Sequence, residues 1–137
     1  MGKTDMEDLK GPGMERRRYP RVPLDLDVVY TVNAPPEVKF RIAGEERNAT
    51  MLNISEGGMA FITDHELPEM TKLDISFHIR LRNGRRSVIN CVGQVCYSFL
   101  LADYHRYHMG IEFISICDKE KRLIVDFVRS RSNKGES

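Results

Sequence analysis

Residues 72–97, KLDISFHIRLRNGRRSVINCVGQVCY, contain two alternating runs that are separated by a glycine turn. In the first run every second residue is apolar, and the residues between are polar or charged; the apolar set is Leu73, Ile75, Phe77, Ile79 and Leu81. A period of two is that of a β-strand with one buried face. Asn83 and Gly84 both tolerate the positive φ of a tight turn, and residues 88–97 return as the partner strand. The stretch predicts an antiparallel β-hairpin.

Similar patterns occur on both sides of this hairpin. Further alternating or apolar runs lie at residues 24–32, 38–42, 48–54, 59–62 and 107–113. Ala34-Pro35-Pro36 separates the first two runs, and the run of Val38, Phe40 and Ile42 is predicted to be a short strand that ends at Gly44. Six or seven strands without intervening helices favour a closed antiparallel barrel or a sandwich, because closure removes exposed strand edges.

The C-terminal part of the sequence changes to a helical period. Asp118 is a suitable N-cap, and apolar residues then recur at helical spacing; these are Leu123, Ile124, Phe127 and Val128. We expect this helix to pack on the sheet. The predicted domain is residues 15–129, with flexible tails at 1–14 and 130–137, because residues 1–14 contain Gly11-Pro12-Gly13 and no packing pattern.

The composition indicates a single soluble domain. The chain has 137 residues, 41% of them hydrophobic and 30% charged, and a formal net charge of +1, which excludes binding of anions by bulk positive charge. No run of about 18 apolar residues or secretory signal is present, so a cytoplasmic protein without membrane attachment is expected. Cys91, Cys96 and Cys117 form no CxxC pair, which predicts reduced, buried thiols.

Arginines are concentrated just before the first strand. The run Arg16-Arg17-Arg18-Tyr19-Pro20-Arg21 places four guanidinium groups in six residues. Arginine can bond O6 and N7 of guanine bidentately, stack on a base, and pair with phosphate. Pro20 favours an extended loop that holds Arg17 and Arg21 apart. The run predicts a local anion site, although a solvated basic segment has the same composition.

A second polar motif is Asn53-Ile54-Ser55-Glu56-Gly57-Gly58. In an extended segment Asn53 and Ser55 point to the same side, so an amide and a hydroxyl would converge. Gly57 and Gly58 allow positive φ and close backbone approach. The alternative interpretation is a turn whose residues serve only chain reversal.

Together the two motifs resemble those of the PilZ family. Arg17 and Arg21 match RxxxR, while Asn53, Ser55 and Gly58 match the downstream [D/N]xSxxG; Gly110-Ile111-Glu112-Phe113 is similar to the family's closing strand. The resemblance covers roughly residues 15–128. It implies an all-β fold, a six-stranded antiparallel β-barrel with a C-terminal α-helix, that binds the bacterial second messenger cyclic di-GMP.

The resemblance also implies roles for individual residues. Arg17 and Arg21 would grip guanine and phosphate, Asn53 and Ser55 would bond the guanine edge or phosphate, and Gly58 would leave room for the ligand. Many relatives carry aspartate where this chain has Asn53, and an amide bonds the guanine donors less strongly. In similar proteins an arginine in the position of Arg16 favours a stacked pair of ligands.

The implied function is that of a receptor and adaptor. Its N-terminal arginine loop would change conformation on ligand binding, and an unidentified effector protein would recognise the change. No serine or cysteine lies in a nucleophile motif, so we expect no enzyme activity and no cofactor. His105 and His108 lack a third metal ligand, and Asp25 and Asp27 are expected to be solvated.

Two alternatives stay open. A β-barrel could bind single-stranded nucleic acid with the same arginines, but the predicted exposed face at residues 72–82 has charges and lacks the stacking aromatics that such binding uses, which disfavours nucleic acid. A domain that binds only protein could place the arginines on an acidic partner.

Overall fold

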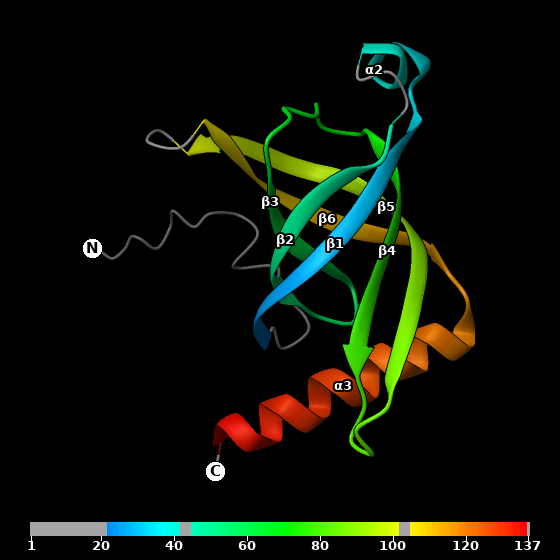
Figure 1. Cartoon of the computed structure of the whole chain (residues 1–137), viewed down its shortest axis with the longest axis vertical. Helices are drawn as coiled ribbons and strands as arrows, with labels where there is room; N and C mark the ends of the chain where they lie inside the picture. Colours follow the sequence, from blue (N-terminus) through cyan, green and yellow to red (C-terminus); the bar gives the residue numbers. More distant parts are fainter. Residues whose placement is uncertain (1–21, 42–44, 102–104, 137) are drawn as a thin grey trace.

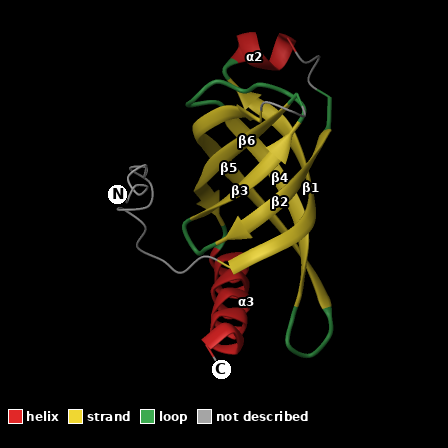
Figure 2. Cartoon of the chain, turned by 90° about the vertical axis from the view of Figure 1, so that its left-hand side faces the viewer, coloured by secondary structure: helices red, strands yellow, loops and turns green. Residues whose placement is uncertain are grey.

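Six antiparallel strands close into a barrel in the computed structural model, which describes residues 22–41, 45–101 and 105–136. The strand order around the barrel is β1-β2-β3-β6-β5-β4, and helix α3 lies at one end (Figures 1 and 2). The strands are β1 (Val22–Ala34), β2 (Arg47–Ile54), β3 (Gly58–Thr63), β4 (Lys72–Arg80), β5 (Arg86–Leu101) and β6 (Arg106–Ile116). The predicted six-stranded antiparallel β-barrel with a C-terminal α-helix is confirmed.

The β4–β5 hairpin forms as the alternation predicts, with one difference in its turn. Its register runs from Lys72 opposite Gln94 to Arg80 opposite Arg86. The Gly84 amide donates to the Leu81 carbonyl over 2.9 Å, and the Leu81 amide donates to the Arg85 carbonyl over 2.7 Å. Of the two residues Asn83 and Gly84, only Gly84 has a positive φ, +85°. The connection is therefore a three-residue loop with glycine in the left-handed position, not the predicted two-residue turn.

The predicted strand at residues 38–42 is wrong, because Pro36–Arg41 forms the short helix α2. Proline suits the first position of a helix, where its missing N–H has no intrahelical partner, and Glu37 favours the first turn electrostatically. The amides of Val38 and Lys39 donate to the Pro35 carbonyl. Val38 is buried, while Glu37 and Lys39 on either side of it are exposed.

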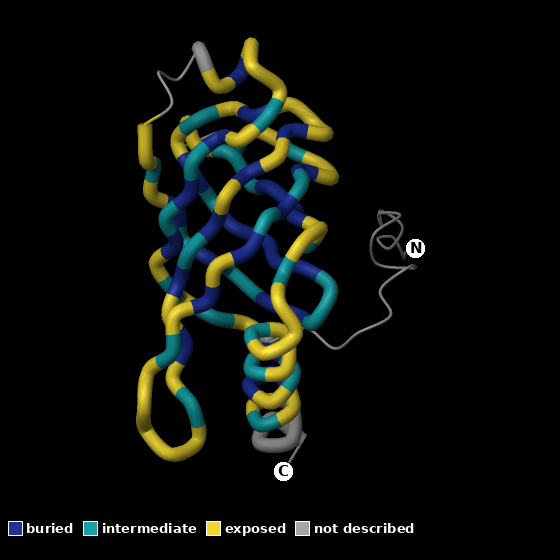
Figure 3. The backbone as a smooth tube through the Cα atoms, turned by 90° about the vertical axis from the view of Figure 1, so that its right-hand side faces the viewer, coloured by how far each residue is buried: buried dark blue, intermediate teal, exposed yellow. Residues whose placement is uncertain are grey.

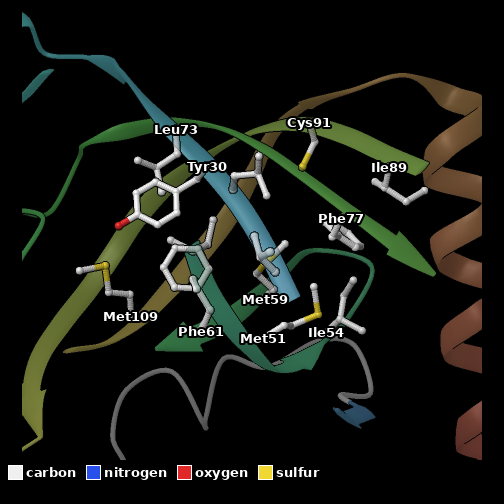
Figure 4. Packing of buried hydrophobic residues seen from close by; sticks show 14 of the residues in the cluster. Tyr30, Met51, Ile54, Met59, Phe61, Leu73, Phe77, Ile89, Cys91 and Met109 are labelled. Atoms are coloured by element: carbon white, nitrogen blue, oxygen red, sulfur yellow. The ribbon is translucent and has the colours of Figure 1, made fainter. Parts of the chain in front are cut away.

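The core is the inner face of the barrel (Figure 4). The Tyr30 ring stacks on Phe61 at a centroid distance of 5.4 Å, and the Tyr30 hydroxyl is 2.7 Å from Thr63 Oγ1. Burial raises the pKa of Tyr30. The hydrogen bond matters because an unpaired hydroxyl in such a core would cost about 1–3 kcal/mol.

The three cysteines are free thiols but do not share one environment. Cys91 belongs to the core, and burial raises the pKa of its thiol to about 12. Cys96 and Cys117 are exposed, contrary to the prediction that all three are buried. Cys96 is exposed because it lies at the bulge of β5 between Val95 and Tyr97. Cys117 is exposed in the link from β6 to α3.

Helix α3 (Asp118–Glu136) buries Ile124, Phe127 and Val128, as its period predicts. Glu120 Oε1 accepts a hydrogen bond of 2.9 Å from the Asn90 amide and ties the helix to β5. The helix includes residues 130–136, which belong to the segment predicted to be a flexible C-terminal tail; no proline interrupts them, and glycine appears only at Gly135. The predicted tail at residues 1–14 lies outside the described residues. None of the helices in the described ranges is long and apolar enough to cross a membrane.

Candidate functional site

The predicted site residues fall into two groups. Arg16, Arg17 and Arg21 lie outside the described residues. Asn53, Ser55 and Gly58 lie at the connection between β2 and β3. This connection is at the barrel end where β6 leads into α3, since Gly57 and Glu56 line the same surface hollow as Asp118.

Ser55 is bonded within its own turn. Its amide donates to the Gly58 carbonyl over 2.8 Å, and its hydroxyl accepts from the Gly57 amide over 3.2 Å. The hydroxyl also lies 3.4 Å from the Gly58 carbonyl oxygen. With 3% of its surface exposed, Ser55 is one of the buried polar residues. The side chain therefore stabilises the chain reversal, which was the alternative interpretation of this motif.

Gly58 is required by the packing of two strands. A Cβ at Gly58 would lie 2.0 Å from the carbonyl oxygen of Ile111 in β6. Gly58 pairs with Glu112, and the Gly57 carbonyl accepts a hydrogen bond of 3.0 Å from the Phe113 amide. The space next to Gly58 is thus filled by the β6 backbone, which is a structural reason for glycine independent of any ligand.

Asn53 faces the outside of the barrel. The β2 register shifts between Met51 and Asn53, so Met51 and Ile54 are both buried while Asn53 is half-buried on the opposite face. The extended geometry that predicted convergence of Asn53 with Ser55 ends at Ile54, where the strand ends. Asn53 is opposite Pro23 of β1, and Ile54 is opposite Val22, the first residue of that strand.

A row of residues leads from Asn53 across the outside of four strands. Asn53 is opposite Ala60, Ala60 is opposite Gly110, and Gly110 is opposite Tyr97. A Cβ at Gly110 would lie 2.1 Å from Tyr97 Cε2, so the ring covers this glycine. Small residues thus form the middle of the row, with an amide at one end and a phenol at the other.

Tyr97 belongs to an exposed aromatic cluster that the sequence did not predict as part of a site. Its ring is stacked with Phe99 at 6.2 Å, and His108 lies edge-on to both rings. Tyr97 and Phe99 are 38% and 49% exposed. Burial lowers the pKa of His108, which favours the neutral ring. Tyr97 and Phe99 share a face of β5 because they are two residues apart, and the register between β5 and β6 adds His108.

The other candidates form no site in the structure. Asp25 and Asp27 are exposed on β1. His105 is exposed, and within the described ranges no three His, Cys, Asp or Glu side chains are grouped as metal ligands would be.

Comparisons with known proteins agree on the family and the fold. A family model described as PilZ domain matches residues 15–130. No curated protein matches this sequence. Among solved structures, the Bacillus subtilis inhibitor of motility MotI/DgrA is 20% identical with a TM-score of 0.71, covering 89% of this chain and 54% of that one.

Two further structures were determined with c-di-GMP. The PilZ domain of YcgR from Escherichia coli is 16% identical with a TM-score of 0.61, and the match covers 88% of this chain and 95% of that domain. MrkH from K. pneumonia is 18% identical with a TM-score of 0.61, and the match covers 88% of this chain and 53% of MrkH. This chain therefore spans about half the length of MotI and MrkH, and at these identities the likeness shows a shared fold.

The close approach at Gly58 predicts a stability effect. Gly58→Ala is expected to lower the free energy of unfolding by about 3 kcal/mol, because the added methyl would overlap the Ile111 carbonyl. Gly84→Ala is the control: it has open space but a positive φ, so a loss of about 1 kcal/mol is expected. Urea denaturation measures both values. A loss at Gly58 no larger than at Gly84 would contradict the steric explanation.

Proposed function

The chain belongs to the PilZ domain family, and on this premise we propose that it is a cytoplasmic receptor for cyclic di-GMP that acts as an adaptor and not as an enzyme. The c-di-GMP complexes of YcgR and MrkH, which share its fold, support this choice of ligand. The proposal rests on one observation: Val22, the first residue of β1, is opposite Ile54, the last residue of β2.

This register supports a shared site for the two motifs. Val22 is opposite Ile54, and Val22 directly follows Arg21 in the sequence. The arginine-rich segment therefore joins the barrel beside the Asn53–Gly58 motif, although more than thirty residues of chain separate Arg21 from Asn53. Arginines supply charge-assisted bonds to phosphate and bidentate bonds to guanine, and Asn53 supplies an amide on the barrel surface.

Ser55 supports the proposed site first through its turn, since its hydroxyl accepts from the Gly57 amide and lies 3.4 Å from the Gly58 carbonyl. Because only 3% of Ser55 is exposed, the direct bond to the ligand that the motif implies would require this turn to open. The glycine at position 58 keeps β3 close to β6 beneath this point.

The Tyr97 end of the outer row offers an aromatic ring for a guanine base. Tyr97 is exposed, whereas Ala60 and Gly110, which lie between it and Asn53, are buried. Stacking of a base on such a ring contributes about 1–3 kcal/mol. On this basis we assign Tyr97 a contact with one guanine. Asn53 lies at the opposite end of the row.

Ligand binding is proposed to order the arginine segment over the barrel. Four arginines in six residues repel one another, and a dianionic ligand reverses that repulsion. The ligand can drive closure only because it binds the closed form more tightly. The surface formed in this way would be recognised by an effector protein.

The arginine contacts can be tested by calorimetric titration with cyclic di-GMP. Arg17→Ala and Arg21→Ala are each expected to weaken binding at least about tenfold, because each removes a charge-assisted contact. Arg85→Ala is the matched control, since Arg85 is exposed in the β4–β5 loop. GTP and a short oligonucleotide serve as competing ligands. Wild-type affinity in the Arg17→Ala, Arg21→Ala double variant would disprove this site.

The same titration gives the stoichiometry. Two ligands per chain are expected for the wild type, because Arg16 precedes the RxxxR pair as it does in similar proteins that bind a stacked ligand pair. Arg16→Leu should reduce the value toward one. A single ligand in both proteins would remove the role assigned to Arg16.

Closure of the segment predicts protection from trypsin. Saturating cyclic di-GMP is expected to slow cleavage after Arg16, Arg17 and Arg21 severalfold, because an ordered segment fits a protease poorly. Cleavage in the exposed β4–β5 loop, at Arg82 and Arg85, is the internal control. Equal rates with and without bound ligand would exclude the closure while leaving binding itself intact.

A further inference from the structure

A groove lies between the tip of the β4–β5 hairpin and helix α3, at the end of the barrel where α3 packs. Figure 3 shows the hairpin and the helix extending from that end side by side. The groove has a volume of about 950 Å³. Its hairpin wall includes Arg80, Leu81 and Arg82, and its helix wall includes Leu123, Asp126, Phe127 and Arg131.

The groove has an apolar floor between basic rims. Leu81 and Leu123 are half-buried against the core, and Phe127 is buried with only 5% of its surface exposed. Arg80 and Arg82 are exposed on one side of this floor. On the helix side, the Arg131 guanidinium lies 4.6 Å from the centroid of the Phe127 ring and is exposed.

The positive charge at this end is concentrated and unpaired. Arg80, Arg82 and Arg131 line the groove with one acidic residue, Asp126, and the hairpin also carries Arg85 and Arg86, in a chain whose net charge is only +1. Within the described ranges none of these five arginines forms a salt bridge. Their one side-chain hydrogen bond there is from Arg80 Nη1 to the Gly84 carbonyl, 3.2 Å within the hairpin itself. Charges held this close repel one another, and an acidic partner would relieve that repulsion.

We propose that this groove binds an acidic amphipathic helical segment of a partner protein. Apolar side chains on one face of such a helix would lie on Leu81 and Leu123, and its flanking carboxylates would pair with the arginines of both rims. Nucleic acid fits less well, because the one aromatic ring in the groove, Phe127, is buried beneath Arg131 and offers no face on which a base could stack. No residue of the Asn53–Gly58 motif lines the groove, so the test needs no cyclic di-GMP.

A synthetic peptide tests this surface directly. The probe is a fluorescent helical peptide of about 15 residues, with leucines at i, i+3, i+4 and i+7 and glutamates on both flanks. Fluorescence anisotropy at about 0.15 M salt should show binding by the wild type. A scrambled peptide of the same composition should bind at least about tenfold more weakly, because it lacks a continuous apolar face.

Two double variants locate the contact, each with one charge reversal in the β4–β5 hairpin and one in α3. Arg82→Glu with Arg131→Glu reverses charge inside the groove, whereas Arg85→Glu with Arg129→Glu reverses exposed charge outside its lining. The first pair should weaken peptide binding at least about tenfold and the second less than about threefold. Thermal melting of both variants verifies that they fold.

Several results would overturn the proposal. These are no binding of the amphipathic peptide, equal binding of the scrambled peptide, or equal weakening by the two double variants. A single-stranded oligonucleotide or an anionic lipid vesicle that binds more tightly than the peptide, and loses binding in the groove variant, would assign the groove to that class of ligand instead.

Discussion

β1 hydrogen-bonds to β2 along one edge and to β4 along the other, and the rest of the structure depends on this double pairing. Without it the sheet would have two open edges, each with unpaired amides and carbonyls. Because β1 closes the barrel, its first residue is held opposite the end of β2. The point where the N-terminal segment joins the barrel is therefore set by main-chain hydrogen bonds.

The polar motif at the end of β2 has clear structural roles in the same few residues to which we propose a ligand binds. The Ser55 hydroxyl and Gly58 are both explained by the turn and by the contact with β6. Asn53 is different, because the register shift in β2 turns it outward to the strand face that also carries Ala60, Gly110 and Tyr97. A rigid turn beneath the surface allows the outward residues to be presented without rearrangement of the barrel.

Two arginine-rich segments of the chain have different surroundings. The arginines before β1 precede a strand that pairs with the Asn53 segment, which is the basis for proposing that they hold a small anion. The arginines of the β4–β5 hairpin instead face an apolar floor supplied by α3, which suits a partner with both apolar and acidic groups. Similar clusters of one residue type therefore support different interactions, because their surroundings differ.

The strands, the hairpin, the terminal helix and the family motifs could be predicted from the sequence, because alternation, helical period and motif spacing are local properties. The strand predicted at residues 38–42 was wrong: Val38, Phe40 and Ile42 alternate with charged residues, but Pro36–Arg41 forms a short helix. Asn53, Ser55 and Gly58 were visible as a motif, but their separate structural roles were not. The tertiary structure alone places Gly58 against the Ile111 carbonyl, Tyr97 in one row with Asn53, and Leu81 in a groove with Phe127. These relations arise from strand register and from the docking of α3, which join residues far apart in the chain and leave no signal in any short stretch of sequence.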